Sequence, residues 1–462
     1  QPRARRRKPH GRIADALAED EGADPRKLAH HLTAAERLDE AVVQWREAGD
    51  RAGRRSALGE AIGLYQQGLD LLARLPPGPE TDRNRLAILL ALGPVLSAHD
   101  GYGAETVGAL YAEAARLADE AGTPADRFAV RRGLWLYSQM SAQYSAAEIA
   151  AQDMLALTSG GVDDPASALE ASRALGATAF MLGKLNVARA HLETAVEGYA
   201  RGIGTDNAEL YGDDPGLACM AYLSSVLWFL GDPEAARVCS ADMLRIAEAL
   251  DHPFSMARSL TFSAFTYHLM EDYDLLLPTA EQAALHSDRY HFPFHAGVGR
   301  ILWGWGLCRQ GEAARGWEIV EEGYRQYASS GSHMLQPLYL TLMAGLCRDR
   351  GEVRRAQGYS QRAVNSLERS QEDLVKPEVL RLHGALMAEA GDIEGALRLL
   401  RASVSLASLQ NSRFCRLRAL TTALPFDPRR APDLRNALSD FPEGVTAPDI
   451  DAARRALAEL GL

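Results

Sequence analysis

A single spacing of 40 residues organises the second half of this chain. The positions that separate two helix-like segments recur at this spacing, and they are Gly231, Glu271, Gly311, Gly351 and Gly391. A small residue also recurs seven residues before each of these turns, from Ser224 to Gly384. A repeat of this length is typical of stacked helical hairpins, in which each unit buries its apolar face against its neighbours. We therefore predict an all-α, right-handed α-solenoid superhelix of about ten helical hairpins.

The composition narrows the class of protein. Apolar residues make up 47% of the chain, Ala and Leu are abundant, and the alternating runs typical of strands are almost absent. The formal net charge of −11 argues against a general nucleic-acid-binding surface. Five cysteines at irregular spacing form neither a disulfide framework nor a zinc pattern. No apolar stretch approaches the ~20 residues of a membrane span and no signal peptide is evident, so we expect a soluble, cytoplasmic protein without a membrane partner.

The chain divides into five predicted segments. These are a basic tail with the end of a preceding module (1–25), the first hairpins (26–75), a proline-rich hinge (76–80), the main superhelix (81–424), and a linker with a C-terminal capping helix at Ile450 to Leu460 (425–462). Asp164-Pro165 and Asp214-Pro215 are expected to begin helices, because Asp caps the first turn and Pro presets its geometry. Since the first residue is Gln1 rather than Met, we also expect a fragment or a processed product.

Several short stretches carry a resemblance to a known family. They are Leu28-Ala29-His30-His31, Asp213-Asp214-Pro215-Gly216, His252-Pro253-Phe254-Ser255, Ile301-Leu302-Trp303-Gly304-Trp305, and the run from Glu443 to Asp449. With its lengthened tetratricopeptide-like repeats, the chain resembles the C-terminal repeat region of bacterial signalling ATPases of the STAND type, which are often fused to adenylate-cyclase-like, kinase-like or DNA-binding modules. Arg12-Ile13-Ala14 is similar to the last helix of the winged-helix module that precedes the array in that family.

The resemblance implies a sensor or scaffold arm whose parent carries the enzymatic activity elsewhere. One implied partner is the upstream ATPase module of the same parent. This chain itself contains no Gly-x-x-x-x-Gly-Lys-Ser/Thr run and no cyclase or kinase motif, so no nucleotide chemistry can be assigned to it. We expect no enzyme activity and no cofactor.

The repeat register also predicts which side chains face the concave groove. In tetratricopeptide arrays the first helix of each hairpin lines the concave side, and its fifth, ninth and twelfth positions point inward. With three further arginines near helix ends, the predicted groove residues are Arg132, Gln139, Arg173, Phe180, Trp228, Arg258, Phe265, His268, Trp305, Arg309, Arg348 and Arg381. Arginine binds carboxylate or phosphate, and aromatic rings add contact area. The groove therefore favours an anionic peptide segment or a small, partly aromatic acid.

The alternative for the arginines is structural. They could instead pair with neighbouring carboxylates such as Glu170, Asp349 and Glu378 on a solvated face. A histidine-rich stretch from His286 to His295 also invites a metal hypothesis, but Pro293 separates His291 from His295, so the two do not share a helix as metal ligands would. We expect aromatic packing there and no metal site.

Three classes of function remain open at this point. The first is a sensor arm of a signalling ATPase that binds a protein, a peptide or a small anionic ligand. The second is a stand-alone scaffold for protein–protein assembly. The third is an enzyme with an unrecognised site, although no nucleophile or acid–base pair stands at a recognisable spacing, and the adjacent His30 and His31 resemble ordinary helix-packing positions.

Overall fold

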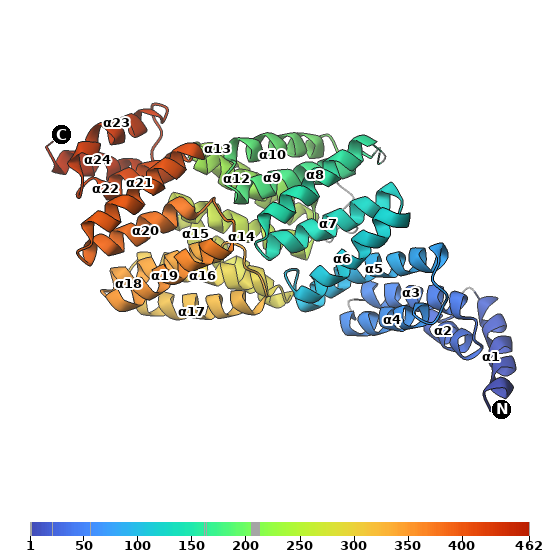
Figure 1. Cartoon of the computed structure of the whole chain (residues 1–462). Helices are drawn as coiled ribbons and strands as arrows, with labels where there is room; N and C mark the ends of the chain where they lie inside the picture. The colour runs from blue at the N-terminus through green and yellow to red at the C-terminus, as the bar shows by residue number, and fades with distance from the viewer. Residues whose placement is uncertain are drawn as a thin grey trace. The chain divides into compact units, whose positions relative to one another are not determined.

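The computed structural model describes residues 2–20, 22–55, 57–160, 162, 164–204 and 213–461, with side chains from residue 7 onward. Within these ranges every regular element is a helix, and successive helices form antiparallel hairpins (Figure 1). The all-α prediction is therefore confirmed. None of the described helices combines the length and the apolar character that a membrane span requires.

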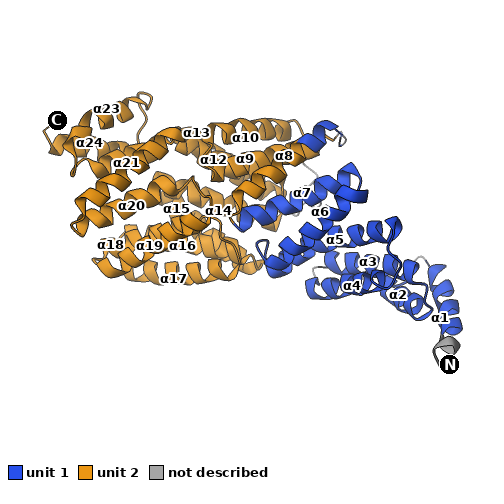
Figure 2. Ribbon diagram, in the orientation of Figure 1, with its two compact units in different colours: residues 1–141, 156–163 blue, residues 142–155, 164–462 orange. Residues whose placement is uncertain are grey.

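The chain forms two compact units (Figure 2). The first comprises residues 1–141 and 156–163, and the second comprises residues 142–155 and 164–462. The helices that lie in the first unit are α1 (Pro2–Ala18), α2 (Pro25–Ala34), α3 (Leu38–Arg54), α4 (Leu58–Leu72), α5 (Pro79–Asp100), α6 (Glu105–Ala121) and α7 (Pro124–Met140). The helix α8 (Tyr144–Gly160) contributes residues to both units. Residues 76–78 of the predicted hinge lie in the turn between α4 and α5, whereas residues 79 and 80 begin α5, and a hinge motion there remains a prediction.

The second unit holds the regular part of the repeat. Its described helices are α9 (Pro165–Met181), α10 (Leu185–Ala200), α12 (Pro215–Phe229), α13 (Pro233–Leu250), α14 (Pro253–Met270), α15 (Tyr273–Arg289), α16 (Pro293–Arg309), α17 (Ala313–Ser329), α18 (Gln336–Asp349), α19 (Val353–Arg369), α20 (Lys376–Glu389), α21 (Ile393–Leu409), α22 (Arg413–Ala423), α23 (Ala431–Ser439) and α24 (Pro448–Glu459).

Backbone geometry explains the spacing of the turns. Gly231, Gly311 and Gly391 adopt φ values of 93°, 96° and 94°, in the left-handed region that glycine enters without steric cost. Glu271 occupies the same conformation, with φ of 55°, although its Cβ disfavours it. The predicted helix starts are also confirmed, because the side chains of Asp164 and Asp214 accept hydrogen bonds from the first backbone amides of α9 and α12.

The small residues of the repeat allow helices of one hairpin to approach closely. A Cβ atom added at Gly297 would lie 2.5 Å from the backbone nitrogen of Tyr327, and one added at Gly304 would lie 2.8 Å from that of Val320. Any larger residue would therefore push α16 and α17 apart. The 40-residue pattern thus marks positions where backbone meets backbone.

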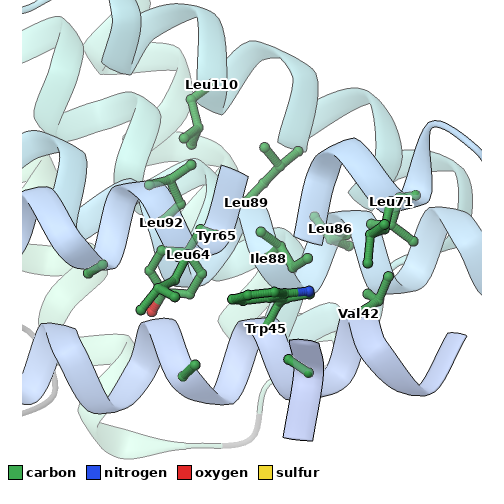
Figure 3. Packing of buried hydrophobic residues seen from close by; sticks show 14 of the residues in the cluster. Val42, Trp45, Leu64, Tyr65, Leu71, Leu86, Ile88, Leu89, Leu92 and Leu110 are labelled. Atoms are coloured by element: carbon green, nitrogen blue, oxygen red, sulfur yellow. The ribbon is translucent and has the colours of Figure 1, made fainter. Parts of the chain in front are cut away.

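Aromatic and aliphatic side chains fill the core of the first unit. Trp45 of α3, Tyr65 of α4 and Ile88 of α5 are buried together (Figure 3). The Tyr65 hydroxyl donates a hydrogen bond to Asp50, 2.7 Å away, which satisfies its polar end. Each helix thus buries its apolar stripe against its neighbours in the array.

The C-terminal segment is more structured than a proline-rich linker. A 3₁₀ turn, η1 (Pro428–Arg430), leads directly into α23 before the final helix α24 begins at Pro448. The sequence pattern predicts the final helix α24 but not α23. Both helices pack against α22.

Candidate ligand-binding site

The second unit contains a cavity of about 320 Å³. Helices from distant repeats surround this cavity. One contact between them joins α12 and α22, where the ring of Trp228 stacks on that of Phe414 with centroids 4.7 Å apart. On the same helix α22, Arg418 donates a hydrogen bond to the backbone carbonyl of Leu269 at the end of α14, at 2.9 Å. The volume falls within the range of small-molecule sites, and most of the lining lies on the first helix of successive hairpins.

Half of the predicted groove residues meet at this cavity. Six of the twelve line it, namely Trp228, His268, Trp305, Arg309, Arg348 and Arg381. The lining also includes charged residues that the sequence analysis did not assign to the groove, namely Glu271, Arg418 and Asp449. Extending the 40-residue register by one repeat would have named Thr421, which lies 40 residues after Arg381 and lines the same cavity.

The other six predicted residues lie elsewhere. Arg132 and Gln139 belong to α7 in the first unit. Phe180 and Phe265 are buried, and the Phe180 ring packs edge-on against Tyr222. The remaining two, Arg173 and Arg258, belong to a charge cluster of the second unit that is separate from the cavity lining.

That charge cluster is built around Asp213. One carboxylate oxygen of Asp213 lies 3.0 Å from Arg173 and 3.0 Å from Arg258, and Arg173 also donates to Glu170 at 2.6 Å. The side chains of Arg173, Glu170 and Asp213 are at most 5% exposed. Because these charges neutralise one another in the interior, they hold α9, α12 and α14 together.

Exposed ion pairs occupy one part of the cavity lining. Arg309 lies 2.8 Å from Asp349, and Arg348 lies 2.6 Å from Glu389. The guanidinium of Arg309 also sits 5.9 Å from the centre of the Trp305 ring. All three carboxylates named in the structural alternative pair with a predicted groove arginine, namely Asp349 with Arg309, Glu170 with Arg173 and Glu378 with Arg381, but only the first pair lies on an exposed surface. Exposed pairs of this kind contribute only about 0–1 kcal/mol, so their geometry can adjust to a ligand.

Two further arginines are fixed more firmly. Arg381 donates to Glu378 at 2.9 Å and to the Thr422 hydroxyl at 3.1 Å. Arg418 forms a two-pronged ion pair with Asp449, at 2.7 and 2.9 Å. Burial acts to raise the pKa of Glu378, but Arg381 outweighs it and the pKa lies below its ordinary value. The Arg381–Glu378 pair is therefore ionised.

Among the described residues that line the cavity, His268 alone has a buried side-chain nitrogen or oxygen without a hydrogen-bond partner. It is 6% exposed, and its Nδ1 has no hydrogen-bond partner. Its ring lies nearly perpendicular to that of Trp305, with centroids 4.2 Å apart. Burial, with a further contribution from Arg418, lowers the pKa of His268 to about 3, so the ring is neutral at neutral pH. An unsatisfied buried polar atom costs about 1–3 kcal/mol, and a ligand could recover that cost.

Glu271 differs from the other carboxylates of the lining. Among the described residues no arginine or lysine lies within ion-pair distance of its side chain, although Arg309 and Arg418 interact with its charge over a longer distance. The one hydrogen bond recorded for its carboxylate comes from the Tyr273 hydroxyl at 3.4 Å. It caps α14 in the left-handed conformation described above. The cavity therefore presents one carboxylate that no neighbouring cation neutralises directly.

The histidine-rich stretch does not form a ligand set on one helix. His291 precedes α16 with φ of 60°, while His295 lies within α16 and is hydrogen-bonded to the Thr261 hydroxyl at 3.1 Å. Across the described ranges, no group of three His, Cys, Asp or Glu side chains is arranged to hold a metal ion.

Comparison with solved structures identifies the type of fold. A Rap protein solved in complex with competence and sporulation factor superposes with a TM-score of 0.59 at 13% identity, covering 80% of this chain and 99% of that chain. The fold is that of a tetratricopeptide-like repeat array. NprR in complex with its cognate peptide NprX gives a TM-score of 0.48 at 11% identity, covering 71% of this chain and 96% of that chain.

Sequence comparison adds one curated relative. The chain is 23% identical over 411 residues to an uncharacterized protein of Rhizobium meliloti (strain 1021). The match covers 87% of this chain but 40% of that protein, so the chain spans less than half the length of this relative. No family model matches the sequence.

Proposed function

We propose that this chain is the ligand-binding repeat region of a signalling regulator, and that the cavity of the second unit holds a peptide segment or a small ligand. The observation that carries the proposal is the combination of Trp305, four arginines and the unpartnered nitrogen of His268 around one cavity. Aromatic area and fixed polar groups are what small binding sites require. The Rap protein of similar fold, solved with competence and sporulation factor, is an example of such an array that holds another molecule.

Ligand binding in the cavity could be coupled to a conformational change of the second unit. Its lining comes from α12, α14, α16 and α18 in the earlier part of the sequence and from α20, α22 and α24 in the later part. A ligand that contacts both sets of helices binds more tightly to the conformation in which the two sets lie close together. Binding therefore shifts the conformational equilibrium toward that state, by an amount set by the difference in affinity. In the proposed parent, a STAND-type ATPase module upstream would respond to that shift. The match to less than half of a longer relative supports a multi-part parent.

Two tryptophans on one helix give a matched test. Trp305 lines the cavity, whereas Trp303, two residues earlier on α16, is absent from the lining and contacts Arg315 instead. We expect pools of short synthetic peptides, tripeptides and longer, to quench tryptophan fluorescence and raise the melting temperature. Trp305→Ala should abolish both effects and Trp303→Ala should preserve them. Equal responses from the two variants, or no response from the wild type, would refute the proposal.

A further inference from the structure

The cavity lining carries equal numbers of arginines and carboxylates, although the carboxylate partner of Arg348, Glu389, lies outside the lining. Four arginines line the cavity, and so do four carboxylates, those of Glu271, Asp349, Glu378 and Asp449. Three of the arginines pair with three of these carboxylates, and Arg348 pairs with Glu389. A purely anionic ligand would add an uncompensated charge or displace a carboxylate from its arginine. Since partly buried charges are stable only when paired, a ligand with no net charge fits this lining better.

The charged side chains of the lining differ in how completely they are paired, and this difference indicates where each charge of a ligand would lie. Glu271 has no cation partner among the described residues, so an ammonium group beside it would complete a pair. Arg309 and Arg348 carry five N–H donors each and use only part of them on their exposed partners. A carboxylate could therefore bind these two arginines without breaking a buried ion pair.

His268 and Trp305 add a third point of contact. The unpartnered Nδ1 of His268 can accept or donate one hydrogen bond, depending on the tautomer of the neutral ring. The Trp305 ring lies nearly perpendicular to the same imidazole, with centroids 4.2 Å apart, and adds apolar surface to this part of the lining. An amide or an aromatic side chain fits this combination.

Building on the proposed function, we infer that the ligand is a small zwitterion of the amino-acid or short-peptide class. Its ammonium group faces Glu271, its carboxylate faces Arg309 and Arg348, and a polar group between the two hydrogen-bonds to His268. This assignment replaces the anionic ligand class that the arginines alone suggest, because it accounts for the carboxylates as well.

Capping the ligand tests the inference on the wild-type chain, so no variant has to fold. The probes are the standard amino acids and pools of the dipeptides made from them, detected by native mass spectrometry and ranked by calorimetry. The tightest binder is then compared with its N-acetylated and C-amidated forms. We expect each cap to weaken binding by about tenfold or more, since each removes one charge-assisted contact. Whether a free amino acid or a dipeptide binds more tightly distinguishes the two sources of the zwitterion.

Variants then locate each charge. In Glu271→Gln, N-acetylation should no longer weaken binding, and in Arg309→Gln, C-amidation should lose its effect, as in a double-mutant cycle. Glu394→Gln on α21, whose side chain is 91% exposed and remote from the lining, is the control that should keep both effects. Capped ligands that bind as well as free ones would overturn the zwitterion.

Failure of the inference can be told apart from failure of the proposed function. If no amino acid or dipeptide binds while the longer peptide pools still bind in a Trp305-dependent way, the zwitterion is wrong and the ligand cavity stands. If neither set of probes binds, both are overturned.

Discussion

Glu372 provides a direct test of how the second unit is held together. This residue precedes α20 and is 1% exposed. Its Oε1 accepts a hydrogen bond from the Tyr144 hydroxyl at 2.8 Å and from the backbone nitrogen of Leu335 at 2.5 Å, whereas Oε2 has no partner among the residues that the structure describes. A single carboxyl group thus joins three segments that are distant in sequence. Burial raises the pKa of Glu372 from 4.5 to about 7, although the two hydrogen bonds act in the opposite direction.

The sign of the resulting pH dependence follows from linkage. Because the folded pKa is raised, the native state binds this proton more tightly than the unfolded state does. The stabilising contribution is therefore fully present below pH 4.5 and is lost as the pH rises through about 7. The pKa difference corresponds to on the order of 3 kcal/mol between protonated and ionised forms.

Glu372→Gln removes the ionisation while preserving the acceptor oxygen. We expect the variant to match the wild type at pH 5 and to exceed it in stability by up to ~3 kcal/mol at pH 8, because it has no charge to bury. Urea unfolding followed by circular dichroism at both pH values measures the difference. As a comparison, Tyr144→Phe removes one donor to the carboxyl group and should lower stability at both pH values by about 1 kcal/mol or more. The loss should be larger at pH 8, because this hydrogen bond favours the ionised form of Glu372. A Glu372→Gln variant that is less stable than the wild type at pH 8 would refute the reasoning.

Three other perturbations test separate parts of the structure. Gly304→Ala should destabilise the chain by about 2 kcal/mol or more because its Cβ would press on the backbone of α17, whereas Gly358→Ala, with open space around its Cβ, should stabilise it by about 0.5 kcal/mol in thermal unfolding. Asp449→Asn should leave Arg418 without its partner and cost at most about 3 kcal/mol, with faster hydrogen exchange in α24; unchanged exchange there would contradict the assignment. Burial raises the pKa of the Cys415 thiol to about 12, so a thiol reagent at pH 8 should label it only after unfolding, as mass spectrometry would show.

The 40-residue spacing of the turns could be predicted from the sequence because the backbone geometry at each turn restricts which residues can occupy it. Turns in the left-handed region select glycine at Gly231, Gly311 and Gly391, and close helix contacts select small residues such as Gly304. The helical period indicates which positions of a helix share one face, and it places Trp305 and Arg381 on the face predicted to line the groove. Both residues line the cavity.

The other residues of the cavity lining could not be predicted in this way, because their positions depend on tertiary contacts that the spacing within one helix or one repeat does not determine. Trp228 meets Phe414 and Leu269 meets Arg418 only because distant repeats come together, and this depends on the small rotation between successive hairpins. Asp449 enters the lining from a helix outside the 40-residue register. Arg173 and Arg258 lie with Asp213, a residue just before α12 whose position the helical period does not specify.

The central claim is that the ligand binds inside the second unit. Hydrogen exchange of the full chain, with and without the tightest-binding peptide or amino acid, tests it most directly. The account predicts slower exchange in the parts of α14, α16 and α24 that line the cavity, with no change in α2, α3 and α4 of the first unit. Protection confined to the first unit, or spread evenly over both, would contradict it.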